Sequence, residues 1–505
     1  RRASLERRLC IVASTVPEAA RLLRSHLAGE TPPGVALGVF DPGRPPRRVF
    51  VYSGQGGTWA GMGQELLEGE PVFREAIEEV DRAFAPLAGW SVREAFPGGP
   101  RSGSLDDTAV AQPALFAFQV AATRLWAAWG VMPEAVVGHS VGEVGAAWAA
   151  GALGLEDAVR VVFHRSRLMQ RVRGLGRMAS VRLAAADLAG WLPAGGAVEV
   201  SGTDGPSATT LSGEPGALDE LLGRLEAGRV EVRRLPFDVA FHGRQMEPLR
   251  SELERALEGL APADPTILFR STVRGAAGRL DAAHWGRHLV EPVSFAPAIE
   301  ALADLPGHFV EIGPHPIHAR SIGECLGPDA RHRVLATAVR ERPERATLLP
   351  SLAEVHAAGR AVELGTAHPG GRFVRLPTYP WDRVRHWVHD GPIAWPDDGN
   401  TQERWVHRLD WIEDVEPPRP AAGPQAWSIV ADRGGVGRAL ATLLARRGDE
   451  VAVSDPDEAE TLAGAHPDRR FVDLSALDAR DPPDGSTAGR ALRTARALAR
   501  SAHPG

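Results

Sequence analysis

The chain has 505 residues, which is enough for several domains and a sizeable hydrophobic core. Its formal net charge of -7 argues against nucleic acid as a partner, and no apolar run approaches the length of a membrane span. All 57 of its Lys and Arg residues are arginine, and the lack of lysine excludes a Walker phosphate loop, a Schiff-base lysine and a Ser–Lys dyad.

The beginning of the chain predicts part of a small domain. A strand at Leu9–Ser14 precedes a helix that begins after Thr15 and runs through Leu27. This is too little to fold alone, so we expect the chain to be a piece of a longer polypeptide. No signal peptide is recognisable, which favours a cytoplasmic location. Two cysteines, Cys10 and Cys325, are too few for a disulfide framework or a cysteine-rich metal site, and no metal is expected.

A glycine-rich loop follows the next predicted strand, Arg48–Tyr52. It reads Ser53-Gly54-Gln55-Gly56-Gly57-Thr58 and continues with further glycines to Gly63. Such a loop lets the backbone approach a ligand closely, and Gln55 is placed to offer an N–H near a nucleophile. A plain flexible turn is the alternative.

The strongest single motif is Val136-Val137-Gly138-His139-Ser140-Val141-Gly142-Glu143. It runs from an apolar strand through a serine flanked by glycines into a helix rich in small residues, the pattern of a nucleophile elbow. The helix N-terminus makes the Val141 amide a natural oxyanion donor. The alternative is a serine that only caps the helix.

An arginine lies on the apolar face of the helix predicted at Leu155–Val172. At about 100° per residue, Arg165 falls in the middle of a stripe, whereas other arginines point the opposite way. The stripe consists of Ala158, Val161, Val162, Leu168 and Met169. A buried guanidinium is costly unless it meets an anion. That anion is either a core carboxylate in a structural ion pair or a carboxylate of the substrate, gripped bidentately.

A βαββαβ pattern occupies residues 177 to about 237 and predicts a ferredoxin-like insert. Its first helix is expected at Ala184–Leu192 and its second at Pro215–Glu226. The last strand leads to Val239-Ala240-Phe241-His242, so His242 could face the elbow across a cleft. An ordinary surface or core histidine is the alternative.

The core resumes with a strand at His308–Ile312, followed by Gly313-Pro314-His315-Pro316. Beyond about residue 360 the chain resembles a linker. A last unit has a strand at Trp427–Ala431, a glycine-rich turn at Gly434–Gly437 and a helix, which together resemble a Rossmann opening without the full G-x-G-x-x-G spacing.

Five motifs, in this order, resemble the acyltransferase domain of modular type I polyketide synthases, of the malonyl-CoA:acyl-carrier-protein transacylase family. They are Gly54-Gln55-Gly56, Gly138-His139-Ser140-Val141-Gly142-Glu143, Arg165-Ser166-Arg167, Ala240-Phe241-His242 and Gly313-Pro314-His315-Pro316. The expected fold is α/β, with an α/β-hydrolase-like core, the ferredoxin-like βαββαβ insert at about 177–240 and a C-terminal Rossmann-like fragment.

The resemblance also implies a domain order. Residues 1–46 would end the linker domain after a ketosynthase, 47–360 would be the acyltransferase, and 361–400 the post-acyltransferase linker. In that linker, Leu376–Trp387 would pack back on the acyltransferase. Residues 401–505, opening with Trp405–Trp411, would be the structural, non-catalytic half of a ketoreductase, whose Gly434–Gly437 loop binds no NADPH.

The implied reaction is a ping-pong transfer of malonyl from CoA to the phosphopantetheine thiol of an acyl carrier protein. Ser140 is the nucleophile, His242 the acid and base, the amides of Gln55 and Val141 hold the oxyanion, and Arg165 binds the free carboxylate. No cofactor is expected in this piece. The partners would be the acyl-CoA, the carrier protein and the ketosynthase and ketoreductase domains of one multifunctional enzyme of antibiotic biosynthesis.

The family's extender-choice motif stands here as Val239-Ala240-Phe241-His242, and together with His139 these residues are expected to bind the substrate. Phe241 matches the malonyl-selecting form because its ring fills the space that an α-methyl group would need, and Val141 leans the same way. Val239 departs from the commoner malonyl motif, and His288 stands where the family often has asparagine. A methylmalonyl-selective enzyme is therefore the alternative.

Two further alternatives belong to other classes. Gly138–Gly142 also satisfies G-x-S-x-G of α/β-hydrolases, so a serine hydrolase or thioesterase is one alternative, but such an enzyme needs a late histidine oriented by an acid. The other is a non-catalytic scaffold piece of a megasynthase, which would fail to acylate itself.

Overall fold

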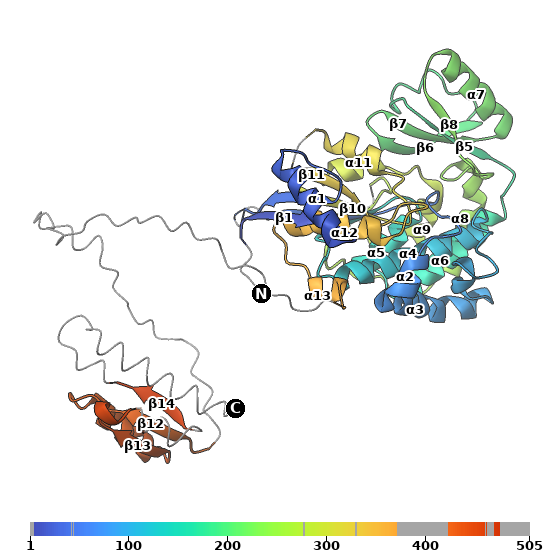
Figure 1. The fold of residues 1–505 in the computed structure, drawn as a ribbon. Coiled ribbons are helices and arrows are strands. Elements are labelled where there is room, and N and C mark those ends of the chain that lie inside the picture. Colours follow the sequence, from blue (N-terminus) through green and yellow to red (C-terminus); the bar gives the residue numbers. More distant parts are fainter. Residues whose placement is uncertain are drawn as a thin grey trace, which may run out of the picture. The chain divides into compact units, whose positions relative to one another are not determined.

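A five-stranded parallel sheet organises the larger part of the chain (Figure 1). The structure is a computed structural model that describes residues 5–41, 43, 45–275, 278–328, 331–370, 423–459, 461 and 469–474. The strand order is β11-β10-β3-β4-β9. The strands are β3 (Arg47–Tyr52), β4 (Ala135–Gly138), β9 (Leu268–Arg270), β10 (Gly307–Ile312) and β11 (His332–Ala336). The chain therefore has the α/β class that the sequence predicts.

The alternation of side chains along these strands explains why both faces of the sheet are covered. Phe50, Tyr52 and Val136 join one large apolar cluster, whereas Val49, Val51 and Ala135 join another. Successive side chains of a strand point to opposite faces, so continuous apolar runs bury both. The first cluster packs against α2 to α6, and the second against α10 and α11.

The helices of this unit connect and cover the strands. The structure places them at α2 (Gln64–Gly69), α3 (Pro71–Ala88), η1 (Val92–Ala95), α4 (Thr108–Ala128), α5 (Gly142–Ala149), α6 (Leu155–Gln170), η2 (Arg244–Met246), α8 (Glu247–Ala256), α9 (Ala282–Val290), α10 (Phe295–Glu300), α11 (Ala319–Leu326), α12 (Arg345–Ala357) and α13 (Leu364–Ala367). None of the helices in the described ranges is both long enough and apolar enough to span a bilayer.

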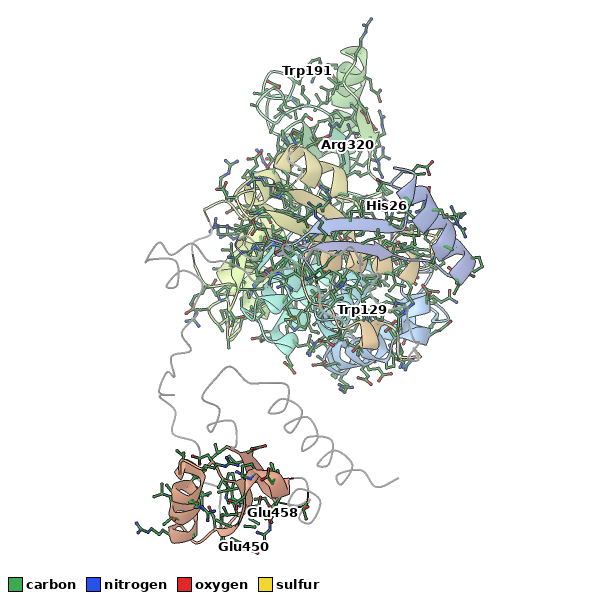
Figure 2. The ribbon with its side chains drawn as sticks, turned by 60° about the vertical axis from the view of Figure 1, so that its left-hand side comes forward. His26, Trp129, Trp191, Arg320, Glu450 and Glu458 are labelled. Atoms are coloured by element: carbon green, nitrogen blue, oxygen red, sulfur yellow. The ribbon has the colours of Figure 1, made fainter. Side chains whose placement is uncertain are left out.

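An antiparallel four-stranded sheet is inserted between α6 and η2. Its order is β6-β7-β5-β8, with helix α7 (Pro215–Ala227) packed on it. The strands are β5 (Arg177–Val181), β6 (Val198–Gly205), β7 (Ala208–Gly213) and β8 (Val232–Arg234). Trp191 lies at the outer end of this insert, away from the central sheet (Figure 2). The helix predicted at Ala184–Leu192 is wrong, because these residues form successive turns.

A short N-terminal segment packs on α12. Strands β1 (Arg7–Ile11) and β2 (Val35–Val39) pair antiparallel, and helix α1 (Val16–Leu27) connects them. His26 lies on this helix (Figure 2). Thr15 caps α1 by accepting a hydrogen bond from the Glu18 amide, as its place before the helix predicts. The predicted strand and helix are therefore both present.

The chain divides into two units, Arg1–Leu376 and Pro377–Gly505. In the second unit β12 (Ala426–Val430) pairs in parallel with β13 (Glu450–Ser454) and β14 (Arg470–Asp473). Helix α15 (Val436–Arg446) follows β12, and η3 spans Pro456–Glu458. The predicted segments Leu376–Trp387 and Trp405–Trp411 lie outside the described residues.

Candidate active site

Ser140 lies on the sharp turn between β4 and α5, at the carboxyl end of the central strands. Its φ of 49° is in the left-handed region, which residues other than glycine rarely adopt. The flanking glycines are needed for close packing: a Cβ on Gly142 would lie 2.2 Å from the Tyr52 carbonyl oxygen, and one on Gly138 would lie 2.3 Å from the backbone of Glu143. The turn therefore has the geometry of a nucleophile elbow.

His242 faces this serine from the segment that follows the inserted sheet. The two side chains are 2.7 Å apart, from Ser140 Oγ to His242 Nε2. The other ring nitrogen, Nδ1, lies 3.2 Å from the backbone carbonyl oxygen of Glu291. Because a carbonyl can only accept, Nδ1 carries the proton and Nε2 is free to accept the proton of the serine. His242 is 3% exposed, and its pKa is held well below the ordinary value by burial and by the positive charge of Arg165. It is therefore a neutral base at physiological pH.

Arg165 points to the same serine from the buried face of α6. All five apolar residues of the predicted stripe are buried, and Arg165 itself is 0% exposed. Its Nη2 donates to Ser140 Oγ over 2.9 Å. In the described part of the chain it forms no ion pair, so the structural pairing considered above is not observed there. Burial lowers its pKa to about 9, partly offset by Glu143, which leaves the guanidinium charged at neutral pH.

Gln112 on α4 was not predicted as a site residue. Its Oε1 accepts from Arg165 Nη1 over 2.6 Å, and its Nε2 donates to Gln55 Oε1 over 3.1 Å. It thus connects the arginine to the glycine-rich loop. The available signal was a polar amide within a mostly apolar helix, where Gln112 is 1% exposed, but Gln119 on the same helix gives the same signal.

The glycine-rich loop lies directly against the nucleophile. A Cβ on Gly54 would come within 3.6 Å of Ser140 Cβ and 2.7 Å of His139 Nδ1. Among the described residues, the backbone amides of Gln55 and Val141 have no hydrogen-bond acceptor. Two unpaired amides beside a serine are what an oxyanion hole requires.

His139 makes a contact that the sequence did not indicate. Its Nε2 donates to Asp204 Oδ1 of the inserted sheet over 2.9 Å, and its ring contacts that of His318, with centroids 4.2 Å apart and planes tilted by 32°. These interactions join the elbow to the insert. His139 forms no hydrogen bond or ion pair with Ser140 Oγ, His242 or Arg165 in the described ranges.

Val239, Ala240 and Phe241 are all buried, at 3%, 2% and 6% exposure. Val239 and Phe241 line a cavity of about 180 Å³ whose other walls are Asp106, Thr108, Arg173, Pro236, Phe237 and Asp238. The Phe237 and Phe241 ring centroids are 5.8 Å apart. The cavity therefore lies beside the predicted extender-choice motif, and Ser140 is not among its walls.

Glu143 is a fully buried carboxylate one turn beyond the serine. It accepts from Ser271 Oγ, from the Thr272 amide and hydroxyl, and contacts His284 Nε2 at 3.1 Å. Burial alone would raise its pKa, but the hydrogen bond from His284 and further interactions lower it to about 2. Glu143 therefore stays ionised and ties α5 to α9. No cluster of three or more potential metal ligands occurs among the residues described.

Comparison with known proteins defines the class. Residues 49–362 match the family model described as the acyl transferase domain. The chain is 38% identical over 440 residues to erythronolide synthase EryA2 of Saccharopolyspora erythraea, covering 85% of this chain and 12% of that protein. It is 34% identical over 523 aligned positions to the pikromycin polyketide synthase component PikAII of Streptomyces venezuelae, covering 100% of this chain and 13% of that protein. The chain thus spans about an eighth of the length of these relatives.

Solved structures narrow the class further. The acyltransferase domain from the second module of the salinomycin polyketide synthase has a TM-score of 0.67 and 36% identity, covering 75% of this chain and 89% of that one. The acyltransferase domain of PpsC of Mycobacterium tuberculosis has a TM-score of 0.56 and 35% identity, covering 63% of this chain and 98% of that one. The chain belongs to the family of polyketide synthase acyltransferase domains, which confirms the resemblance inferred from the five motifs.

Proposed function

We propose that this chain transfers a malonyl group from CoA to the phosphopantetheine thiol of an acyl carrier protein through an ester on Ser140. One observation supports an acyl group that bears a free carboxylate. Arg165 is a fully buried cation, 2.9 Å from the nucleophilic oxygen, and forms no ion pair with the described residues. A substrate carboxylate would supply the missing negative charge, whereas an uncharged acyl chain would leave the guanidinium without it.

The first half of the reaction acylates the enzyme. His242 Nε2 takes the Ser140 proton as Oγ attacks the thioester carbonyl carbon. The carbonyl oxygen becomes an oxyanion that the Gln55 and Val141 amides stabilise, each by about 3 kcal/mol if they act like other such donors. The C–S bond then breaks, and CoA leaves as a thiol with the proton from His242.

The second half reverses these steps with another thiol. His242 takes the proton of the phosphopantetheine thiol, whose sulfur attacks the ester carbon. The bond to Ser140 Oγ breaks, and His242 returns the proton to that oxygen. Arg165 would hold the carboxylate throughout, with Gln112 orienting its guanidinium.

The proposal includes the finer architecture of the fold and the domain boundaries. The strand order β6-β7-β5-β8 supports a ferredoxin-like insert, and parallel strands ending at the elbow support an α/β-hydrolase-like core. The parallel pairing of β12 with β13 and β14 supports a Rossmann-like C-terminal fragment. We retain the domain boundaries given above, a cytoplasmic location, and the carrier protein, ketosynthase and ketoreductase as partners.

One contact distinguishes this proposal from an α/β-hydrolase. Such an enzyme orients its histidine with an acid. Here the Glu291 backbone carbonyl accepts from His242 Nδ1. The buried Phe241 ring supports malonyl over methylmalonyl, because it would crowd an α-methyl group.

Intact-mass spectrometry tests the proposal. Mixed with malonyl-CoA, the protein should gain one malonyl group, and Ser140→Ala should gain none. Methylmalonyl-CoA and acetyl-CoA should label more slowly. Faster methylmalonyl labelling would reverse the extender assignment. A covalent group on Ser140→Ala, or rapid release of free malonate without any carrier protein, would refute the transferase mechanism.

A further inference from the structure

His288, on the last turn of α9, contacts the backbone of the nucleophile. Its Nε2 lies 3.0 Å from the carbonyl oxygen of Ser140, and the residue is 2% exposed. The same carbonyl accepts the Glu143 amide at the start of α5, over 2.8 Å. Ser140 therefore has its backbone oxygen bonded from two sides while it holds a φ of 49°. Such conformations persist only where the surroundings hold them.

The chemistry of this contact fixes the tautomer of His288. A carbonyl oxygen can only accept, so Nε2 carries the proton. Nδ1 is buried without a partner among the described residues, which suits a lone pair better than a second N–H. Burial, and the nearby Arg165, favour the neutral ring and lower the His288 pKa to about 3.

The end of α9 thus holds both halves of the dyad. His288 binds the Ser140 carbonyl with its side chain, and three residues later Glu291 accepts from His242 Nδ1 with its backbone. The helix itself is anchored: Asp281 caps its start through the His284 amide, and the His284 ring contacts Glu143. A shift of α9 would therefore change the separation of Ser140 and His242.

We propose that His288 is a positioning residue, whose Nε2–H holds the Ser140 backbone in the left-handed conformation that brings Oγ to His242. The proposal rests on the acyl-serine mechanism. It predicts an effect on the chemical steps rather than on substrate binding, because His288 forms no hydrogen bond with Arg165 or Gln112 in the described structure.

Two substitutions of His288 by side chains of similar length distinguish the loss of its hydrogen-bond donor from the loss of its packing. Gln at position 288 offers an amide N–H at about the reach of His Nε2, whereas Met fills similar space without a donor. In single-turnover acylation by malonyl-CoA, His288→Met should be slower by about 10- to 100-fold, the loss expected from a misplacement on the order of 1 Å. KM for malonyl-CoA should stay nearly unchanged, and His288→Gln should recover most of the rate.

Several outcomes would overturn the proposal. The proposal is wrong if His288→Met acylates at the wild-type rate, or if His288→Gln is as slow as His288→Met at equal thermal stability. It is also wrong if His288→Met changes only KM for malonyl-CoA and not the rate of acylation. His308→Met, at a buried histidine on β10, controls for replacing an interior imidazole and should keep the rate. If His288→Met does not fold, nitrogen NMR of the wild-type rings decides, since a proton on Nδ1 of His288 contradicts the assignment. Failure of the wild-type protein to acylate at all would refute the proposed function instead.

Discussion

Among the described residues, the charge of Arg165 is partly balanced by Glu143 at a distance and not by a contacting carboxylate. Burial lowers its pKa, the ionised Glu143 partly offsets that effect, and the nearest polar groups are neutral oxygens of Gln112 and Ser140. Neutral acceptors satisfy hydrogen bonds but not the charge of a desolvated cation. An incoming carboxylate therefore gains more at this site than it would in water.

The residue-scale prediction concerns acyl choice. Replacing Arg165 with Ala should reduce kcat/KM for malonyl transfer by roughly 30- to 5,000-fold, because truncating one partner of a buried charge pair typically costs about 2–5 kcal/mol. Acetyl transfer should be spared or improved, since acetyl has no charge to lose. The measurement is the ratio of kcat/KM for malonyl-CoA and acetyl-CoA.

Arg167→Ala is the matched control, because Arg167 is on the same helix but exposed. It should leave the malonyl/acetyl ratio unchanged. If Arg165→Ala also leaves that ratio unchanged, the carboxylate clamp is wrong.

At this scale the sequence predicted the residues that a local pattern exposes. Arg165 follows from helical periodicity, and Ser140 from its glycines. Gln112, Glu291 and Asp204 were not identified, because their roles depend on contacts between residues 49 or more positions apart, which no local pattern encodes. Glu291 could not be found by residue type at all, since it acts through its backbone.

At the scale of elements, the inserted sheet is tied to the core beside the elbow. Asp204 at the end of β6 accepts from His139 Nε2, and the Thr203 amide donates to the Val293 carbonyl. Burial alone would raise the Asp204 pKa, but the hydrogen bond from His139 lowers it, so the carboxylate is ionised. The segment carrying His242 leaves this same sheet, and its position therefore depends on these ties.

Removing the carboxylate should loosen this connection. Asp204→Ala should lower the free energy of unfolding by about 1.5–3 kcal/mol, the range for hydrogen bonds to charged groups, and slow acylation as well. Asp204→Asn keeps an acceptor for His139 and should lose less of both. Urea unfolding and single-turnover acylation measure the two quantities.

Asp219→Ala offers a comparison within the insert. The side chain of Asp219 on α7 is 44% exposed and pairs with Arg177 and Arg234, so its loss should cost at most about 1 kcal/mol. An Asp204→Ala protein no less stable than Asp219→Ala would show that the contact with His139 does not hold the insert.

The helix predicted at Ala184–Leu192 shows where element prediction fails. Its alanines favour a helix, but nine residues before Pro193 are too few to form one without tertiary support. The segment instead forms four-residue turns, in one of which the Asp187 amide donates to the Ala184 carbonyl, and it buries Leu188 against the sheet. The strands on either side were predicted correctly because their alternating apolar residues specify a face.

At the scale of the whole molecule, every candidate site residue lies in the first of the two units. Gln55, Gln112, Ser140, Arg165 and His242 all precede Leu376. In the second unit, Asp432 accepts from the Gly437 and Val436 amides at the glycine-rich turn. Those N–H groups, which would face a pyrophosphate in a dinucleotide site, are thus already bonded within the chain. That the turn binds no NADPH stays a prediction.

A chain ending at Asn400 should therefore acylate Ser140 with malonyl-CoA at the rate of the full 505-residue chain. It retains both central apolar clusters, every candidate site residue and the predicted post-acyltransferase linker. A second chain ending at Gly370 tests whether the linker packs back on the acyltransferase: if it does, this shorter form should unfold at lower urea concentration than the form ending at Asn400. Equal urea midpoints for the two shortened chains would show that the linker does not pack back on the acyltransferase. A loss of acylation in the Asn400 form, with its fold intact by circular dichroism, would show that the C-terminal unit takes part in the reaction.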